Sequence, residues 1–235
     1  MPGAAVWHDL ECGAYDLDLP LWRALAAETG GAVLDVGAGT GRVSLDLAAT
    51  GVPVTALDAD AELLATLEHR AAGLPVETAV ADARDFALPQ RFELVLVPMQ
   101  TLQLLDGRAG RAAFLRRALE HLQPGGVLAA AVADAMDCFD GEHCAPPPAD
   151  ACEIDGVRYA STLLAVREED GRAAIHRRRE ITGRATADVV VRLDRVTPRE
   201  IEAEAAELGF VVEPALSVAE TDEYLGSTVL VLRAP

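Results

Sequence analysis

The amino-acid sequence predicts an α/β fold in which helices cover a mostly parallel β-sheet and a smaller antiparallel sheet is inserted late in the chain. Between residues 31 and 135, short and almost wholly apolar runs alternate with helical patterns, which is typical of a parallel sheet buried on both faces. Beyond residue 136 the pattern changes. Asp155-Gly156 and Asp170-Gly171 each separate two strand-like runs there, and an Asp-Gly pair in that position is a strong sign of a β-hairpin.

Taken in order, the apolar runs predict seven strands for the main sheet. They cover residues 32–36, 52–57, 76–80, 92–97, 127–132, 211–217 and 227–233, the last two antiparallel to each other. Helices are expected over 40–50, 61–72 and 108–122. An earlier helix is capped by Asp18 and ends at Gly30-Gly31, and a last one begins at the capping box Thr197-Pro198-Arg199-Glu200 and ends at Gly209.

The segment between the last two groups of strands has a different character. An irregular loop over 136–151 leads into a short strand near 152 and then into strands 157–167, 172–182 and 186–196 of an antiparallel meander. We therefore divide the chain into four parts. They are an N-terminal lid and helix (1–30), a core (31–135), an inserted loop and antiparallel β region (136–196), and a C-terminal helix and strands that complete the core sheet (197–235).

Composition excludes several classes of partner. The chain has 235 residues and a formal net charge of −18, and so acidic a surface repels phosphate backbones, which argues against nucleic acid. No apolar run reaches the ~18 residues that cross a bilayer, and the first residues lack the pattern of a secretory signal. All 20 basic residues are Arg, which excludes Schiff-base chemistry on Lys. We predict a cytoplasmic monomer or homodimer without a metal site, because the four cysteines form no Cys-x-x-Cys pair.

A glycine-rich turn between the first strand and its helix carries the clearest chemical signal. The sequence reads Val33-Leu34-Asp35-Val36, followed by Gly37-Ala38-Gly39-Thr40-Gly41. Glycines there let the backbone turn tightly and let a ligand approach the carboxyl edge of the sheet. Dinucleotide-binding enzymes also use such a turn, but Arg42 stands where their third glycine would fall. Asp35, just before the glycines, is placed to receive an ammonium group, which a dinucleotide does not offer.

On this segment the chain resembles the class I S-adenosylmethionine-dependent methyltransferases of the small-molecule type. The resemblance covers most of residues 31–135 and the last 40 residues. It implies a Rossmann-like seven-stranded methyltransferase sheet with a C-terminal antiparallel hairpin. It also implies that the methionine part of the cofactor lies over Gly37, Ala38, Gly39 and Gly41, with Asp35 near its amino group. The product would be S-adenosylhomocysteine.

Two further strand ends supply candidate cofactor contacts. An acid at the end of the second strand can accept hydrogen bonds from both ribose hydroxyls, and Asp58, followed by Ala59, has that position. Asp60 suits the N-cap of the next helix better. By resemblance to the family, Asp82 would meet the adenine amine, with the Ala83 backbone nearby. A solvated turn is the alternative interpretation of Asp82.

The end of the fourth strand, Val97-Pro98-Met99-Gln100, is where the family places residues that border both cofactor and acceptor. We therefore assign Pro98 to the cofactor and Met99, Gln100 and Gln103 to the substrate. The two glutamines fit equally well as plain helix-cap and surface residues. The segment lacks the Asn-Pro-Pro-Tyr or Asp-Pro-Pro-Tyr motif of base and amide methyltransferases, which argues against those acceptors.

Candidates for a general base are few: His176, Tyr15 and His143. Trp7, His8 and Tyr15 either close over the site or anchor the lid to the sheet. Strand alternation places His176, Arg178 and Glu180 on one face and Arg177 and Arg179 on the other. The arginines either bind an acidic substrate group or, as we expect, pair with the chain's own carboxylates. Apolar candidates to line an acceptor pocket are Met99, Met136, Phe139 and Tyr159, which pack the insertion onto the core equally well in the alternative.

The sequence thus predicts an enzyme that moves a methyl group from S-adenosylmethionine to a nitrogen or oxygen of a small metabolite, without nucleic-acid or membrane partners. Methyl transfer is an in-line displacement in which the cofactor supplies the chemistry and the protein mainly positions the groups. Two alternatives remain at this point. One is a cofactor-binding protein with a non-methylating or regulatory role, and the other is a nicotinamide-dependent oxidoreductase on a similar sheet.

Overall fold

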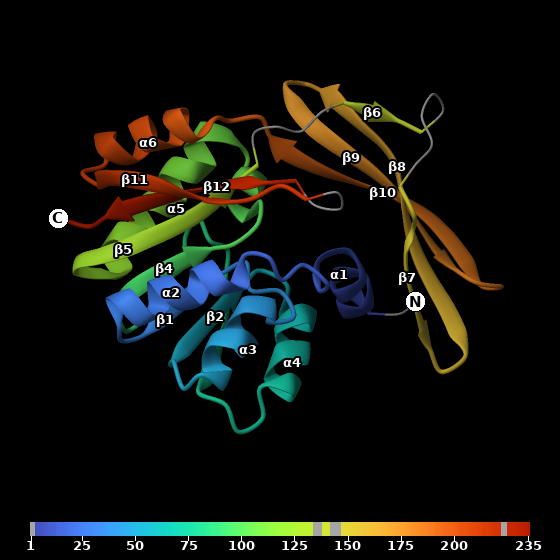
Figure 1. Ribbon diagram of the computed structural model, residues 1–235, viewed down its shortest axis with the longest axis horizontal. Coiled ribbons are helices and arrows are strands. Elements are labelled where there is room, and N and C mark those ends of the chain that lie inside the picture. The colour runs from blue at the N-terminus through green and yellow to red at the C-terminus, as the bar shows by residue number, and fades with distance from the viewer. Residues whose placement is uncertain (1–2, 134–137, 142–146, 222–224) are drawn as a thin grey trace.

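The computed structural model describes residues 3–133, 138–141, 147–221 and 225–235, which form two β-sheets and the helices packed on them (Figure 1). The larger sheet has seven strands in the order β11-β12-β5-β4-β1-β2-β3. They are β1 (Val33–Val36), β2 (Val54–Asp58), β3 (Val76–Val80), β4 (Phe92–Val97), β5 (Leu122–Val132), β11 (Val211–Val218) and β12 (Ser227–Arg233). The first five pair in parallel, and β12 pairs antiparallel with both β5 and β11. The predicted seven-stranded sheet with a C-terminal antiparallel hairpin is confirmed.

Helices cover both faces of this sheet. Figure 1 shows α2 (Leu19–Thr29), α3 (Arg42–Ala49) and α4 (Ala61–Arg70) on one face, with α5 (Gly107–His121) and α6 (Pro198–Glu207) on the other. Successive strand residues point to opposite faces, so Val127, Ala129 and Ala131 pack with α2 and α3. Leu128, Ala130 and Val132 pack with α5 and α6. Burial on both faces explains why the strands read as continuous apolar runs.

Helix starts follow the local signals in part. Thr197 Oγ1 accepts from the Glu200 backbone N–H at 3.3 Å and Glu200 Oε2 accepts from the Thr197 N–H at 2.8 Å, so the predicted capping box is confirmed. Asp60 caps α4, also as expected. Asp18 stands at the N-cap of α2, but the expectation that its side chain caps the helix is wrong. Its carboxylate instead accepts from Arg42 Nη1 and Nη2 at 2.5 and 2.9 Å, which ties α2 to the start of α3.

The N-terminal segment contains a helix that the sequence did not predict. α1 (Ala4–Cys12) lies between α4 and the second sheet (Figure 1). Gly3 at its N-cap has no side chain that could cap the helix, and Trp7 is the one residue of α1 that is buried in the described structure. So short a helix is marginal alone, and contacts with α4, β7 and β8 stabilise it. None of the helices in the described ranges is long and apolar enough to cross a membrane.

The second sheet is the predicted antiparallel insertion. It consists of β6 (Phe139–Asp140), β7 (Asp150–Ile154), β8 (Val157–Glu169), β9 (Arg172–Ile181) and β10 (Ala185–Asp194). The order is β10-β9-β8, and both β6 and β7 pair with β8. Both residues of the Asp155-Gly156 and Asp170-Gly171 turns have positive φ, as a two-residue type I′ hairpin requires. Of the predicted loop over 136–151, residues 136–137 and 142–146 lie outside the described residues.

Candidate functional site

A cavity of about 610 Å³ lies at the carboxyl edge of β1, β2 and β4, between this edge and the inner face of β9 and β10. It brings together most of the residues that the sequence assigned to the cofactor. Those on its wall are Asp35, Gly37, Ala38, Asp58, Ala59, Asp82, Ala83 and Pro98, together with Met99 and Gln100 from the predicted substrate set. The second sheet contributes Ile175, Arg177, Val191 and Leu193. The insertion therefore borders the cavity, in agreement with the expectation that it lies over the site.

The glycine turn is packed more tightly than a ligand site alone would need. A Cβ at Gly37 would lie 2.5 Å from Thr101, and one at Gly39 would lie 2.2 Å from His8 Nε2. Gly39 also has a φ of +56°, a conformation that favours glycine. Gly41 packs against Leu67 of α4. Neither Gly39 nor Gly41 lines the cavity. The glycines thus admit protein side chains from α1, from the segment after β4 and from α4.

Asp35 is a buried carboxylate with one of its two oxygens unpartnered among the described residues. Its side chain is 1% exposed, and Oδ2 accepts from Ser44 Oγ at 2.6 Å. Oδ1 has no partner among the described residues. Burial raises the pKa of Asp35 to about 6. Because an unsatisfied buried acceptor is costly, this oxygen is suited to receive a charged donor such as an ammonium group.

Asp58 joins the glycine turn to the end of β2. Its Oδ2 accepts from the Gly39 N–H at 2.8 Å and its Oδ1 from the Asp60 N–H at 2.9 Å. Each carboxylate oxygen has a second lone pair, so both retain capacity for a hydroxyl donor. Asp58 therefore shapes the turn in addition to the ribose role that the sequence suggests.

Asp82 lies on the wall, but Arg84 holds its carboxylate. Oδ1 accepts from Arg84 Nε at 2.9 Å and Oδ2 from Arg84 Nη2 at 2.6 Å. Arg84 also donates to Asp106 at 2.8 Å. The hydrogen bonds from Arg84 lower the pKa of Asp82. An adenine amine at this position would share the carboxylate with Arg84, and the adenine role of Asp82 stays a prediction.

The part of the cavity wall formed by the segment after β4 and by the second sheet is largely apolar. Met99, Leu104 and Leu105 come from the segment after β4, which includes the 3₁₀ helix η1 (Thr101–Leu104), and Ile175 and Val191 come from the second sheet. Met99 has a φ of +55°, a strained conformation for a residue with a side chain. Gln100 and Arg177 are polar members of this wall. Such a surface suits a ligand with an apolar body and few polar contacts.

Several predicted site residues lie elsewhere. Gln103 is buried, donating to the Ala133 and Asp194 carbonyls at 3.0 and 3.1 Å and accepting from the Ala133 N–H at 3.0 Å. This amide bridges η1, β5 and β10 and is not on the cavity wall. Tyr15 is buried, and the Arg42 guanidinium lies 5.1 Å from its ring centre. Trp7 packs edge-on against Tyr159 at 5.9 Å between ring centres, so these two residues anchor α1 to the insertion.

The expected strand alternation of β9 is confirmed, and it turns His176 away from the cavity. His176 Nε2 is 2.8 Å from Glu169 Oε1, and Arg178 pairs with Asp188 at 2.7 Å. On the other face, Arg179 donates to Glu11 of α1 at 2.7 and 2.8 Å. Phe139 does not line the cavity. His143 and Met136 lie outside the described residues.

The sequence missed Glu11 and Cys12 as cavity residues, because both belong to the unpredicted helix α1. Arg177 was expected to pair with carboxylates, with an acidic substrate group as the alternative partner of the arginine run. Arg177 pairs with Asp150 and, at 3.7 Å, with Glu11, but it also reaches the wall. The alternation of β9 was the available signal, because it separates Arg177 from His176.

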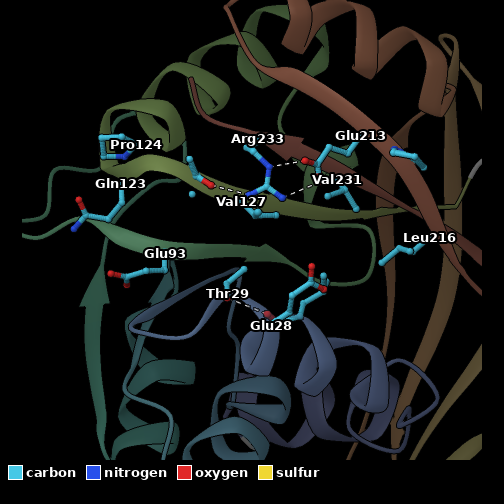
Figure 2. Close-up of a pocket in the computed structure, with 14 residues that line it drawn as sticks. Glu28, Thr29, Glu93, Gln123, Pro124, Val127, Glu213, Leu216, Val231 and Arg233 are labelled. Carbon is cyan, nitrogen blue, oxygen red and sulfur yellow. Dashed lines mark hydrogen bonds and ion pairs between the residues drawn. The ribbon is translucent and has the colours of Figure 1, made fainter.

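A second hollow of about 430 Å³ lies at the opposite, amino-terminal edge of the sheet (Figure 2). Figure 2 shows Arg233 pointing toward Glu213, and Arg233 Nε donates to Glu213 Oε1 at 2.5 Å. Arg233 Nη1 donates to the Gly125 carbonyl at 2.8 Å. Glu93 Oε2 accepts from the Ala32 N–H at 2.8 Å. None of the residues assigned to the cofactor lines this hollow.

Comparison with known proteins agrees with the site. Residues 33–126 match the family model described as a methyltransferase domain. The cypemycin N-terminal methyltransferase of a Streptomyces species is 36% identical over 111 residues, which span 47% of this chain and only 43% of that protein. The sugar N-methyltransferase KedS8 from Streptoalloteichus has a TM-score of 0.77 at 19% identity, covering 100% of this chain and 94% of that chain. CalS10, an amino pentose methyltransferase from Micromonospora echinaspora, has a TM-score of 0.72 at 22% identity, with 100% and 98% covered.

The methyltransferase-domain model thus matches residues 33–126, and the chain shares its fold with the solved methyltransferase structures. The residues present fit S-adenosylmethionine, because Asp35 Oδ1, which has no partner among the described residues, would accept from its ammonium group. The nicotinamide-dependent alternative gains no support from these comparisons.

Proposed function

We propose that this protein transfers the methyl group of S-adenosylmethionine to a nitrogen of a small, partly apolar acceptor. The observation that carries the proposal is a single cavity whose wall combines Asp35 and Asp58 with the apolar side chains of Met99, Ile175 and Val191. The names of similar proteins support nitrogen, since they describe a cypemycin N-terminal methyltransferase and a sugar N-methyltransferase. The acidic net charge of −18 argues against a nucleic-acid acceptor.

The titratable groups that α1 adds to the cavity wall favour an amine over a hydroxyl. Glu11 is committed to Arg179 and to Ser161, whose hydroxyl donates to it at 2.7 Å. Although burial alone would raise the pKa of Glu11, the bonds from Arg179 and Ser161 leave it lowered, so Glu11 is a poor base. Burial raises the pKa of Cys12 to about 11 and keeps it a thiol. A hydroxyl acceptor gains from a base, whereas an amine needs only to arrive neutral.

The chain's own residues bind and orient the reactants. When bound, S-adenosylmethionine supplies an electrophilic methyl group and leaves as neutral S-adenosylhomocysteine. Asp35 and Asp58 would hold the cofactor by its ammonium and ribose groups. The apolar side chains of Met99, Ile175 and Val191 exclude water and disfavour the charged form of an amine placed against them. Arg177 Nη1 has no partner among the described residues and offers a donor to a carbonyl or carboxylate of the acceptor.

The test is transfer from S-adenosylmethionine carrying an isotopic label in its methyl group. Matched pairs of small amines and alcohols with the same apolar body would be incubated with the protein, and labelled products identified by mass spectrometry. We expect the amines to react faster, and Asp58→Ala to slow transfer roughly 10- to 100-fold at a subsaturating cofactor concentration. Faster reaction of the alcohols would show that the choice of nitrogen is wrong. Cofactor binding without transfer to any acceptor, peptides included, would favour the non-methylating alternative.

A further inference from the structure

His8 of α1 reaches the cavity from outside the core. The half-buried side chain lines the cavity, and its Nε2 and Cε1 atoms are the ring atoms nearest to Gly39. The Gly39 N–H donates to Asp58 at 2.8 Å, so His8 and Asp58 flank one residue of the glycine turn. His8 and Asp58 both line the cavity, so a side chain from the lid and the acid assigned to the ribose border it beside the same glycine turn.

The hydrogen bonds behind His8 fix its tautomer. Thr40 Oγ1 donates its single hydrogen to Asp9 Oδ1 at 2.6 Å, and Arg70 holds that carboxylate with Nη1 at 2.9 Å and with Nη2. Burial alone would raise the pKa of Asp9, but the bonds from Arg70 and Thr40 leave it lowered, so Asp9 is an acceptor. Because Thr40 has no second hydrogen, it must accept from His8 Nδ1, which lies 3.2 Å away. The proton is thus on Nδ1, and the lone pair is on Nε2.

That lone pair has no use within the described part of the chain. Nε2 makes no hydrogen bond to any described residue, and it belongs to a side chain on the cavity wall. Burial lowers the pKa of His8, and Arg42 at the start of α3 acts in the same direction, while Asp9, Glu11 and Asp58 oppose it. The ring is therefore neutral near pH 7 and can accept a hydrogen bond there.

We propose that His8 is a cofactor-binding residue whose Nε2 accepts a hydrogen bond from one ribose hydroxyl of S-adenosylmethionine, while the other hydroxyl donates to Asp58. His8 and Asp58 both lie next to Gly39, and Asp58 is the acid suited to the ribose. We therefore assign a ribose hydroxyl as the donor to His8. The inference rests on the cofactor of the proposed function but not on methyl transfer. In this arrangement α1 closes over the bound cofactor and completes its contacts, with Thr40 and Asp9 as positioning residues.

The first test compares two substitutions at position 8 by calorimetric titration with S-adenosylhomocysteine. His8→Phe keeps a ring against Gly39 but removes the acceptor, and we expect roughly 3- to 10-fold weaker binding. His8→Gln keeps an acceptor at about the position of Nε2 and should recover most of the affinity. Analogues of S-adenosylhomocysteine that lack the 2′- or the 3′-hydroxyl identify the donor. Loss of one of these hydroxyls should weaken binding to the wild-type protein but leave the affinity of His8→Phe unchanged. Equal affinities of all three proteins would overturn the proposal.

The second test needs no substitution at His8. In nitrogen NMR of the ¹⁵N-histidine-labelled wild-type protein, the His8 signals should show the Nδ1–H tautomer, and S-adenosylhomocysteine should shift Nε2 more than Nδ1. Thr40→Val should lose the tautomer preference, while Thr40→Ser, which keeps the hydroxyl, should retain it. An Nε2–H tautomer in the wild-type protein would overturn the proposal. Wild-type protein that binds S-adenosylhomocysteine with these signatures but transfers no methyl group would contradict only the proposed function.

Discussion

The two ends of the parallel strands each border a hollow, but they differ in how their polar groups are satisfied. At the amino edge, Arg233 and Glu93 are paired with protein groups (Figure 2). At the carboxyl edge, Asp35 Oδ1 is buried without a partner among the described residues, and His8 Nε2 has none there either. Met99 adds a strained backbone to the same edge. Unsatisfied groups that a fold retains at a stability cost mark the side where a ligand completes them.

The largest expected effect concerns Asp58. Asp58→Ala should weaken binding of S-adenosylhomocysteine by about 1.5–3 kcal/mol for each charged hydrogen bond lost, roughly 10- to 100-fold. Calorimetric titration measures this, with circular dichroism to check the fold. Glu213→Ala at the amino edge is the matched control and should leave the affinity unchanged. Equal losses of affinity in both variants would show that the two edges do not differ in cofactor binding. An unchanged affinity of a folded Asp58→Ala protein would show that Asp58 does not bind the ribose.

Replacing Asp35 by Asn should stabilise the free protein but weaken its binding of the cofactor. Its pKa of about 6 in the folded protein lies above the ~3.9 of an unfolded chain. Between these values the folded state holds a proton that the unfolded state has lost, so stability falls as pH rises through this window and stays lower above it. Asp35→Asn cannot ionise and should stabilise the free protein at pH 7.5 by about 1–3 kcal/mol.

The measurement is urea unfolding at pH 7.5 and at pH 4, where the difference should largely vanish. The same variant should bind S-adenosylhomocysteine more weakly, because the ammonium group loses its carboxylate. Wild-type affinity should fall as pH drops through about 6, and Asp35→Asn should lose much of that dependence. If Asp35→Asn were less stable than the wild-type protein at pH 7.5 and bound S-adenosylhomocysteine equally well, the ammonium group would bind elsewhere.

Two glycines allow the edges to be compared with one substitution. Gly39 and Gly125 both have positive φ, +56° and +74°, so alanine strains the backbone at either position, by about 1–2 kcal/mol. Only at Gly39 does the new Cβ meet a side chain, 2.2 Å from His8 Nε2, whereas Gly125 faces open space. Gly39→Ala should therefore cost more stability than Gly125→Ala, by about 1 kcal/mol, and should alone weaken cofactor binding. Thermal unfolding and titration decide this, and identical behaviour would mean that His8 moves aside freely.

The smallest effect is expected from the ion pair at the amino edge. Arg233 and Glu213 have side chains 39% and 30% exposed, and such pairs contribute about 0.2–1 kcal/mol. Arg233→Met should lower the free energy of unfolding by no more than this and leave binding and transfer unchanged. A large loss of cofactor affinity in this variant would contradict the assignment of function to the carboxyl edge.

Local patterns determined the sheet and much of the candidate cofactor site. The alternation of apolar runs and helices predicted the seven strands, because burial on both faces demands continuous apolar residues. Chain order placed the glycine turn, Asp58 and Asp82 at one edge, since parallel strands end on the same side. Asp-Gly pairs predicted the hairpins of the insertion, because few residues adopt the left-handed conformations of that turn.

What only the tertiary structure decided is which long-range contacts fill that edge. The sequence did not predict α1, because its stability comes from α4 and the second sheet rather than from its own caps. Nor did it predict that His8 packs on Gly39, that Gln103 bridges β5 and β10, or that Arg177 reaches the cavity while His176 faces away from it. A residue type and its spacing specify which element it stands on. The partner of its side chain depends on how elements far apart in the chain pack, which local periodicity does not encode.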